Sequence, residues 1–103
     1  MYAVIRRYTV TRGSMDDLVR QVEQGFLPLV SQIPDFISYE LLVEGDDAFS
    51  TISVFGSEAG TRESTRQAGE FVRDQLRGFE LERRDTVEGA VRVHREAALA
   101  GAR

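Results

Sequence analysis

The sequence predicts an α+β domain in which strands and helices follow one another in the order β-α-β-β-α-β. Two segments carry apolar residues at the three- and four-residue spacing of a helix. Four others are short, with the β-branched and aromatic residues typical of strands, and turn signals separate most of these segments. The 103 residues make one domain, which we expect to span residues 1–96, with a tail at 97–103.

The first strand is expected at residues 2–11, and Ser14 is suited to cap the helix that follows. Pro28 lies inside this helix and lacks a backbone N–H, so we expect a kink near residues 24–25. Pro34 ends the helix. Its apolar stripe has spacings of four, four, three and four residues and is widened by two valines: Leu18, Val22, Phe26, Leu29 and Ile33, with Val19 and Val30.

The second half begins with strands at residues 36–44 and 48–55, which a short turn joins into an antiparallel hairpin. Ser57 caps the second helix, and Gly78 ends it. The apolar face of this helix is formed by Ala68, Phe71, Val72 and Leu76.

The last part of the chain is expected to be a charged loop followed by a strand. Residues 79–88 form the loop, in which Arg83-Arg84-Asp85 is simply solvated. Residues 89–96 form the strand, with Val91 and Val93 on one face and Arg92 and His94 on the other.

This element order is the split βαβ, or ferredoxin-like, plan, with both helices on one face of a four-stranded antiparallel sheet. The strands carry apolar residues on both faces, for example Val4 and Val10 against Ala3 and Ile5. A sheet with one wet face alternates more cleanly. We therefore expect two protomers to pack sheet to sheet as a dimeric α/β barrel. The alternative is a monomer with an apolar open face.

Composition excludes several classes of function. The net charge of −4 and the dispersed arginines argue against binding nucleic acid. No apolar run is long enough to cross a membrane, and the first residues do not resemble a secretory signal, so a cytoplasmic location is expected. The absence of cysteine and the single histidine argue against a metal site, and the absence of lysine excludes Schiff-base chemistry.

Three runs of the sequence resemble the antibiotic biosynthesis monooxygenase-like (ABM-like) group of dimeric α/β-barrel proteins. They are Tyr8-Thr9-Val10-Thr11-Arg12-Gly13, the stretch from Phe26 to Leu42, and Ile52-Ser53-Val54-Phe55-Gly56-Ser57-Glu58-Ala59. The resemblance covers residues 2–96. It implies a homodimeric barrel with one pocket per protomer, between helices and sheet, and no cofactor in the oxygenases that act on polycyclic phenols or quinols.

The residues that several active members share are replaced in this chain. The family's first-strand asparagine corresponds to Arg6, and its second-helix tryptophan corresponds to Ser64. Haem-degrading members also place a histidine ligand on the second helix, whereas the one histidine here is His94. All three differences argue against haem degradation, and two argue against quinone formation.

Arg6 and Arg7 are adjacent on the central strand, so one faces the helices and the other faces the barrel. A buried arginine needs a carboxylate or a ligand anion. Arg6 is therefore either paired with Glu40, Glu44 or Glu88, or it lines the pocket and holds a phenolate or carboxylate. In an oxygen-dependent reaction it would stabilise the substrate anion.

Other candidate site residues each have a simpler structural interpretation. Tyr8, on the Arg6 face, and Tyr39 could orient a polar substrate, or pack as amphipathic core residues. His94 is a candidate general base, or a surface residue at a strand edge. The small residues Gly60, Ser64 and Ala68 leave room for a ligand walled by Phe71, or allow close packing of helix on sheet.

Two functions remain open from the sequence. The chain is a cofactor-independent monooxygenase of an aromatic or polyketide-like molecule, with Arg6 as anion holder and Tyr8 as orienting hydroxyl. Alternatively, it is a non-catalytic dimeric barrel that binds a small apolar ligand or serves as an assembly module.

Overall fold

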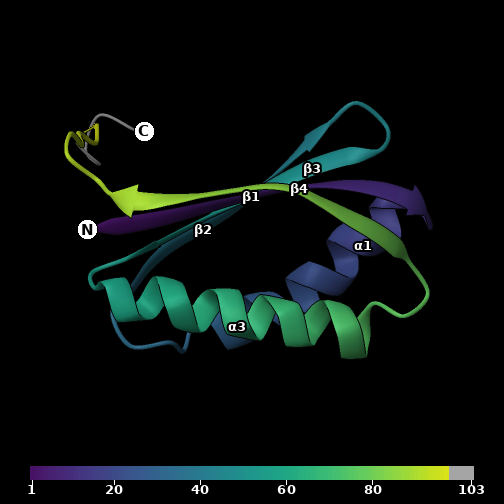
Figure 1. Ribbon diagram of the computed structural model, residues 1–103, viewed down its shortest axis with the longest axis horizontal. Coiled ribbons are helices and arrows are strands. Elements are labelled where there is room, and N and C mark those ends of the chain that lie inside the picture. The colour runs from purple at the N-terminus through teal and green to yellow at the C-terminus, as the bar shows by residue number, and fades with distance from the viewer. Residues whose placement is uncertain (98–103) are drawn as a thin grey trace.

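The computed structural model describes residues 1–97 and has the expected ferredoxin-like α+β architecture. One layer is a four-stranded antiparallel sheet, and the helices form a second layer against one face of it (Figure 1). The elements follow in the order β1 (Tyr2–Arg12), α1 (Met15–Gln21), η1 (Val22–Phe26), α2 (Leu27–Val30), β2 (Phe36–Glu44), β3 (Ala48–Phe55), α3 (Glu58–Gln75) and β4 (Glu80–Ala90). Apart from its first residue, the expected tail lies outside the described residues.

The strands lie in the order β2-β3-β1-β4, so β1 is a central strand, as the sequence predicts. β2 and β3 form the predicted antiparallel hairpin. Gly45 in its turn has a φ of 62°, a left-handed conformation that glycine adopts without strain. Residues paired across strands share a face of the sheet, so the register decides which side chains point toward the helices.

Both predicted helix N-caps are confirmed. The Ser14 hydroxyl accepts a hydrogen bond from the Asp17 N–H at 3.3 Å, and the Ser57 hydroxyl accepts one from the Gly60 N–H at 3.3 Å. Each bond satisfies a donor that the first helical turn leaves without a partner. α3 ends at Gln75, slightly before the predicted stop.

The first helical segment contains a turn of π-helix, η1, at the predicted position of the kink. Pro28 has no N–H for the carbonyl four residues earlier, and the Leu27 N–H bonds the Val22 carbonyl, five residues earlier. The wider turn rotates the helix that follows. Val30 is fully buried, whereas Leu29 is 49% exposed. The prediction that Leu29 belongs to the apolar stripe was therefore wrong, because it assumed a constant helical period.

The prediction for the last strand was also wrong. β4 spans Glu80–Ala90, and the expected loop at residues 79–88 pairs along most of β1. β4 is an edge strand, where charged side chains discourage pairing with other chains, so it lacks the apolar alternation that identifies a strand. Residues 91–97 follow it without regular secondary structure, so the expected strand faces of Arg92 and His94 do not form.

The sheet has a core face and a second face that carries apolar residues, as predicted. Val87, Ile5 and Ile52 are directly paired across three strands on the face away from the helices. Ile5 and Ile52 are half-buried, and Val87 is 61% exposed. Phe36 belongs to the core face, where it packs against the buried Phe55, because the register shifts between residues 36 and 38. None of the helices in the described part of the chain could span a membrane.

Candidate functional site

Arg6 is the most unusual residue of the core, because it is charged and only 1% exposed. It lies in the middle of β1 and points toward α3. Its Nη2 donates hydrogen bonds to the hydroxyls of Ser64 at 3.0 Å and Thr65 at 2.9 Å. Both hydroxyls in turn donate to the Thr61 carbonyl. One terminal nitrogen of the guanidinium is therefore bound by hydroxyl groups on α3.

Among residues 1–97, Arg6 has no carboxylate partner, so the expected ion pair is absent. Glu44 bonds Arg7 at 3.2 Å on the opposite face of the sheet. Glu40 points to that face as well, since it pairs with Ile52 while Arg6 pairs with Thr51. Glu88 exerts only the weakest of the effects on the pKa of Arg6. The buried cation therefore keeps capacity for an anion.

The unused donors of Arg6 lie beside other unpaired polar atoms. Arg6 Nε is buried and has no hydrogen-bond partner in the described residues, and the same holds for the hydroxyls of Thr51 and Ser53 on β3. Burial lowers the pKa of the Arg6 guanidinium, which nevertheless stays protonated in proteins. An unpaired buried donor is costly, so this arrangement favours a ligand that supplies the missing acceptor.

A small cavity reaches Arg6 from between the sheet and the helices. Its volume is about 30 Å³, enough for water but not for an aromatic ring. Its walls are apolar except for the polar groups of one arginine, one threonine and two tyrosines. The lining residues include Arg6, Tyr8, Tyr39, Thr51, Ala68 and Phe71. Apolar walls with a few convergent polar groups are typical of small-molecule sites.

Both candidate tyrosines line this cavity. Tyr8 is buried and its ring stacks on Phe49 with centroids 4.8 Å apart. Tyr39 packs against Phe26 with centroids 5.7 Å apart. Burial raises the pKa of the Tyr39 phenol above its ordinary value, and the positive charge of Arg6 opposes that rise. Tyr39 is therefore a neutral hydroxyl at physiological pH.

The small-residue row on α3 serves two purposes along its length. A side chain at Gly60 would come within 2.7 Å of the Phe55 ring, so the first turns of the helix pack closely on the sheet. Ser64, expected to contact substrate, instead accepts the hydrogen bond of Arg6. Ala68 and Phe71 line the cavity. Close packing of helix on sheet is therefore confirmed at Gly60, whereas room for a ligand beside Ala68 stays a prediction.

His94 lies away from this site. It follows β4, its side chain is about half exposed, and its Nε2 is 3.4 Å from a carboxylate oxygen of Glu96. It does not line the cavity beside Arg6. The structure therefore gives the proposed general base no contact with the other candidate residues.

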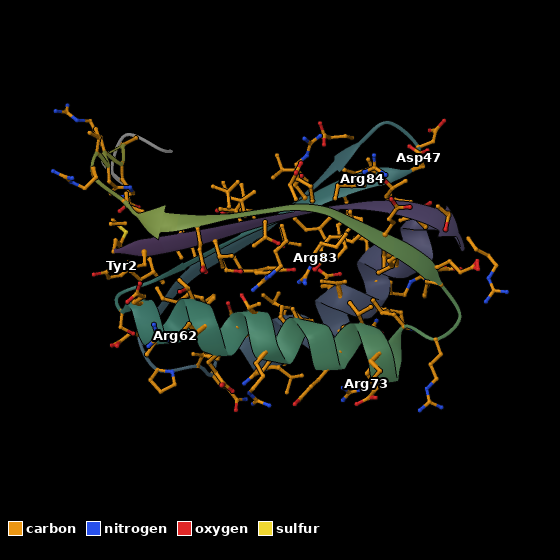
Figure 2. The ribbon with its side chains drawn as sticks, viewed as in Figure 1. Tyr2, Asp47, Arg62, Arg73, Arg83 and Arg84 are labelled. Atoms are coloured by element: carbon orange, nitrogen blue, oxygen red, sulfur yellow. The ribbon has the colours of Figure 1, made fainter. Side chains whose placement is uncertain are left out.

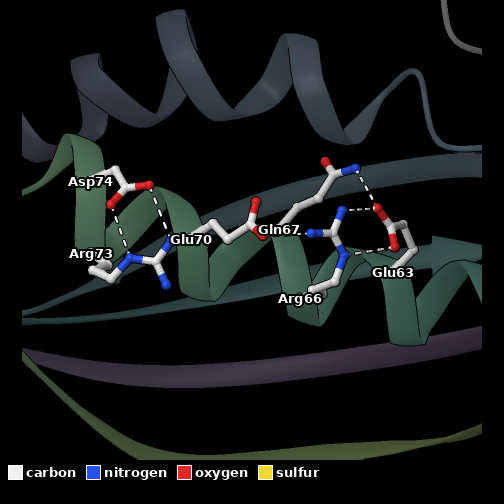
Figure 3. A network of polar contacts seen from close by, with 6 residues as sticks. All are labelled: Glu63, Arg66, Gln67, Glu70, Arg73 and Asp74. Atoms are coloured by element: carbon white, nitrogen blue, oxygen red, sulfur yellow. Dashed lines mark hydrogen bonds and ion pairs between the residues drawn. The ribbon is translucent and has the colours of Figure 1, made fainter.

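The solvent face of α3 carries a chain of paired charges (Figure 3). Arg66 binds both Glu63 and Glu70, and Arg73 binds Asp74 at 2.9 Å. Hydrogen bonds from Arg66 and Gln67 lower the pKa of Glu63 to about 2. These groups neutralise one another in water, which is typical of an exposed helix face and does not indicate a site.

Some residues around Arg6 were not expected from the sequence. Thr51 is its neighbour on β3, and the hairpin register could have identified it. Thr65 precedes the apolar stripe of α3 by one turn and gave no signal of its own. Leu81 lines the cavity from β4, which the sequence pattern had assigned to a loop.

The fold matches several solved structures across nearly the whole chain. The cofactor-independent oxygenase SnoaB from Streptomyces nogalater shares 18% identity at a TM-score of 0.67, with 90% of this chain and 94% of that chain covered. A dimeric ferredoxin-like protein from an uncultured marine organism shares 10% identity at a TM-score of 0.71, covering 93% and 98%. The NE2512 protein of unknown function from Nitrosomonas europaea shares 18% identity at 0.66, covering 94% of each chain.

Sequence comparison gives the family. No curated protein matches the chain. The model of the antibiotic biosynthesis monooxygenase (ABM) family matches residues 1–73, which include β1, the first helical segment, the hairpin and most of α3. The matched range contains Arg6, its hydroxyl partners and most of the cavity wall. The chain therefore belongs to the antibiotic biosynthesis monooxygenase family.

Proposed function

We propose that this chain is a cofactor-independent monooxygenase that acts on an aromatic molecule with a phenolic or enolic oxygen. One observation carries the proposal: a buried arginine without a carboxylate partner in the described residues lies at an apolar cavity. The family and the described activity of SnoaB support it. Arg6 holds the oxygen of the substrate as an anion, and Tyr8 orients the ring.

The reaction requires only the substrate and oxygen. Loss of a proton from an acidic CH₂ group of the substrate gives an enolate, which Arg6 stabilises through its unused N–H donors. The carbanion carbon adds O₂ and gains a proton, giving a hydroperoxide. Elimination of water from this hydroperoxide leaves a carbonyl, so that R₂CH₂ and O₂ become R₂C=O and H₂O. The oxidised carbon supplies the electrons.

The substrate must widen the cavity as it enters. A volume of about 30 Å³ lies far below the several hundred Å³ of typical ligand sites. Tyr8, Ala68, Val72 and Leu81 separate it from an outer pocket of about 260 Å³ between α3 and β4. Rotation of the two aliphatic side chains, Val72 and Leu81, would join the two spaces.

The barrel form of the protein is part of the proposal. The apolar patch of Ile5, Ile52 and Val87 lies on the sheet face that no helix within residues 1–97 covers, and a second copy of the same sheet would complete the barrel. We propose that the chain is a homodimer in the cytoplasm. Ile52→Asp should give a folded monomer in sedimentation at micromolar concentration, while an unchanged dimer would place the interface elsewhere.

A non-catalytic ligand-binding or assembly role is the alternative. It is favoured by Arg6 at the position of the family's asparagine and by the lack of tryptophan. In that role Arg6 would hold a ligand anion without electron transfer to oxygen.

Oxygen uptake with 1,8-dihydroxyanthrone separates the two functions. The enzyme should form the anthraquinone above the protein-free rate in the presence of EDTA, with the new carbonyl oxygen derived from ¹⁸O₂. Arg6→Met should lower the rate at least about a hundredfold, the scale of losing one oxyanion donor. Arg62→Met, on the solvent face of α3, is the matched control. Equal rates for Arg6→Met and the wild type would refute the proposal, and binding without oxygen uptake would support the alternative.

A further inference from the structure

A second unpaired cation lies on the same side of the sheet as Arg6. Arg83 on β4 lines the outer pocket, together with Tyr8, Ala68, Gly69, Val72 and Leu81. Within residues 1–97 no carboxylate lies within ion-pair distance of it, whereas its neighbour Arg84 binds Glu82 at 2.6 Å. Arg83 is exposed, so its charge faces the entrance rather than the core.

A β-bulge gives Arg83 this direction. Arg7 pairs with Asp85, but the next residue, Tyr8, pairs with Arg83, so Arg84 is the extra residue. In an unbroken ladder Arg84 would pair with Tyr8 and point toward the helices. With the bulge, Arg83 takes that place, and Figure 2 shows the two arginines on opposite sides of the sheet. Bulges commonly redirect a side chain next to a functional site.

The two cations line two neighbouring spaces that share mostly apolar walls. Arg6 contacts the inner cavity and Arg83 the outer pocket, and the two spaces share walls of Tyr8, Val72 and Leu81. Arg83 also acts on Arg6 electrostatically, lowering its pKa. A ligand that met only Arg6 would leave this second positive charge uncompensated above an apolar wall.

We propose that Arg83 binds a carboxylate at the mouth of the site, so that the substrate is an aromatic acid with an acidic oxygen at each end. This inference rests on the proposed function, since it takes Arg6 as the holder of the inner oxygen. Arg83 selects among aromatic molecules, and it also attracts anions toward a protein whose net charge is −4.

A matched pair of ligands tests the inference. The probes are 6-hydroxy-2-naphthoate and its methyl ester, which differ only in the outer charge. The wild type should bind the acid about fivefold more tightly, the scale of one exposed ion pair. Arg83→Gln should abolish this preference and leave the affinity for the ester unchanged. Arg84→Gln is the control and should retain the preference.

Salt supplies a second readout that does not depend on a variant. The preference for the acid should shrink as ionic strength rises, because Arg83 is exposed, whereas affinity for the ester should change little. A wild type that binds the ester through Arg6 but does not prefer the acid overturns the inference and leaves the proposed function standing. The inference is also overturned if Arg83→Gln and Arg84→Gln reduce the preference for the acid equally. Binding of neither probe to the wild type overturns both proposals.

Discussion

Replacing Arg6 by methionine should make the protein more stable while abolishing its binding of phenolic ligands. The guanidinium is 1% exposed and unpaired with any carboxylate in the described residues, so folding removes it from water without an opposite charge. The effective penalty for burying such an ion is several kcal/mol. Methionine replaces the unbranched stem of arginine with flexible apolar atoms and carries no charge.

The structure gives the size of the effect. The variant loses two hydrogen bonds from Nη2, each worth about 1.5 kcal/mol or more. Each hydroxyl keeps one hydrogen bond, because Ser64 and Thr65 still donate to the Thr61 carbonyl. Relief of the ion's desolvation exceeds this loss, as it does when buried ionic groups are replaced by apolar ones, so we expect a net gain of about 1–2 kcal/mol.

Thermal and urea unfolding at one fixed protein concentration measure this gain. For a domain of this size it corresponds to a rise in Tm of about 5 °C or more. Arg62→Met removes an exposed ion pair with Glu58 on α3 and should change stability by less than about 0.5 kcal/mol. A loss of stability of 1 kcal/mol or more in the Arg6 variant would refute the reasoning, because Arg6 would then be a structural residue.

Three further predictions concern the core. In urea titration, Val30→Asp should lower the free energy of unfolding by about 3 kcal/mol or more, and Leu29→Asp by less than about 1 kcal/mol. The reason is that η1 turns only Val30 inward, and equal losses of stability would contradict the π-helical turn. Gly60→Ala should cost about 1–3 kcal/mol by crowding a buried ring, whereas Gly69→Ala, with open space around it, should not destabilise; calorimetry on both separates packing from helix propensity. Burial raises the pKa of Tyr39, so the unfolded chain loses the phenol proton at lower pH than the folded protein does, and stability should fall as pH rises above about 10. Tyr39→Phe should flatten that decline, and an unchanged slope of stability against pH would contradict the prediction.

Helix boundaries and the hairpin could be predicted because local chemistry determines them. Ser14 and Ser57 cap helices through hydrogen bonds to residues three positions ahead. Gly45 provides a positive φ at the hairpin turn. These signals are contained in a few consecutive residues, so one sequence suffices to read them.

Features that depend on contacts between distant segments could not be predicted. β4 is defined by its pairing with β1, and its charged edge position hides the strand pattern. Leu29 leaves the predicted apolar stripe and Val30 stays in it, because the π-helical turn η1 changes the helical period. Sequence periodicity assumes regular elements, and both errors arise where an element is irregular or is stabilised mainly by its neighbour.

The grouping of some candidate site residues could be predicted. Arg6, Tyr8 and Tyr39 are brought together at one cavity. Whether Arg6 forms an ion pair depends on which face of the sheet each glutamate occupies. The strand register determines that face, and composition does not reveal it. His94 was misplaced together with the strand that was expected to carry it.

The central claim is that the unused N–H donors of Arg6 hold the anionic oxygen of a ligand. The Nε–H resonance of Arg6 in ¹⁵N-labelled protein, identified by its loss in Arg6→Met, reports this contact directly. On titration with methyl 6-hydroxy-2-naphthoate the resonance should shift and saturate, with the bound naphthol absorbing as its anion at a lower pH than in water. Saturable binding of the ester that leaves this resonance unmoved would contradict the account.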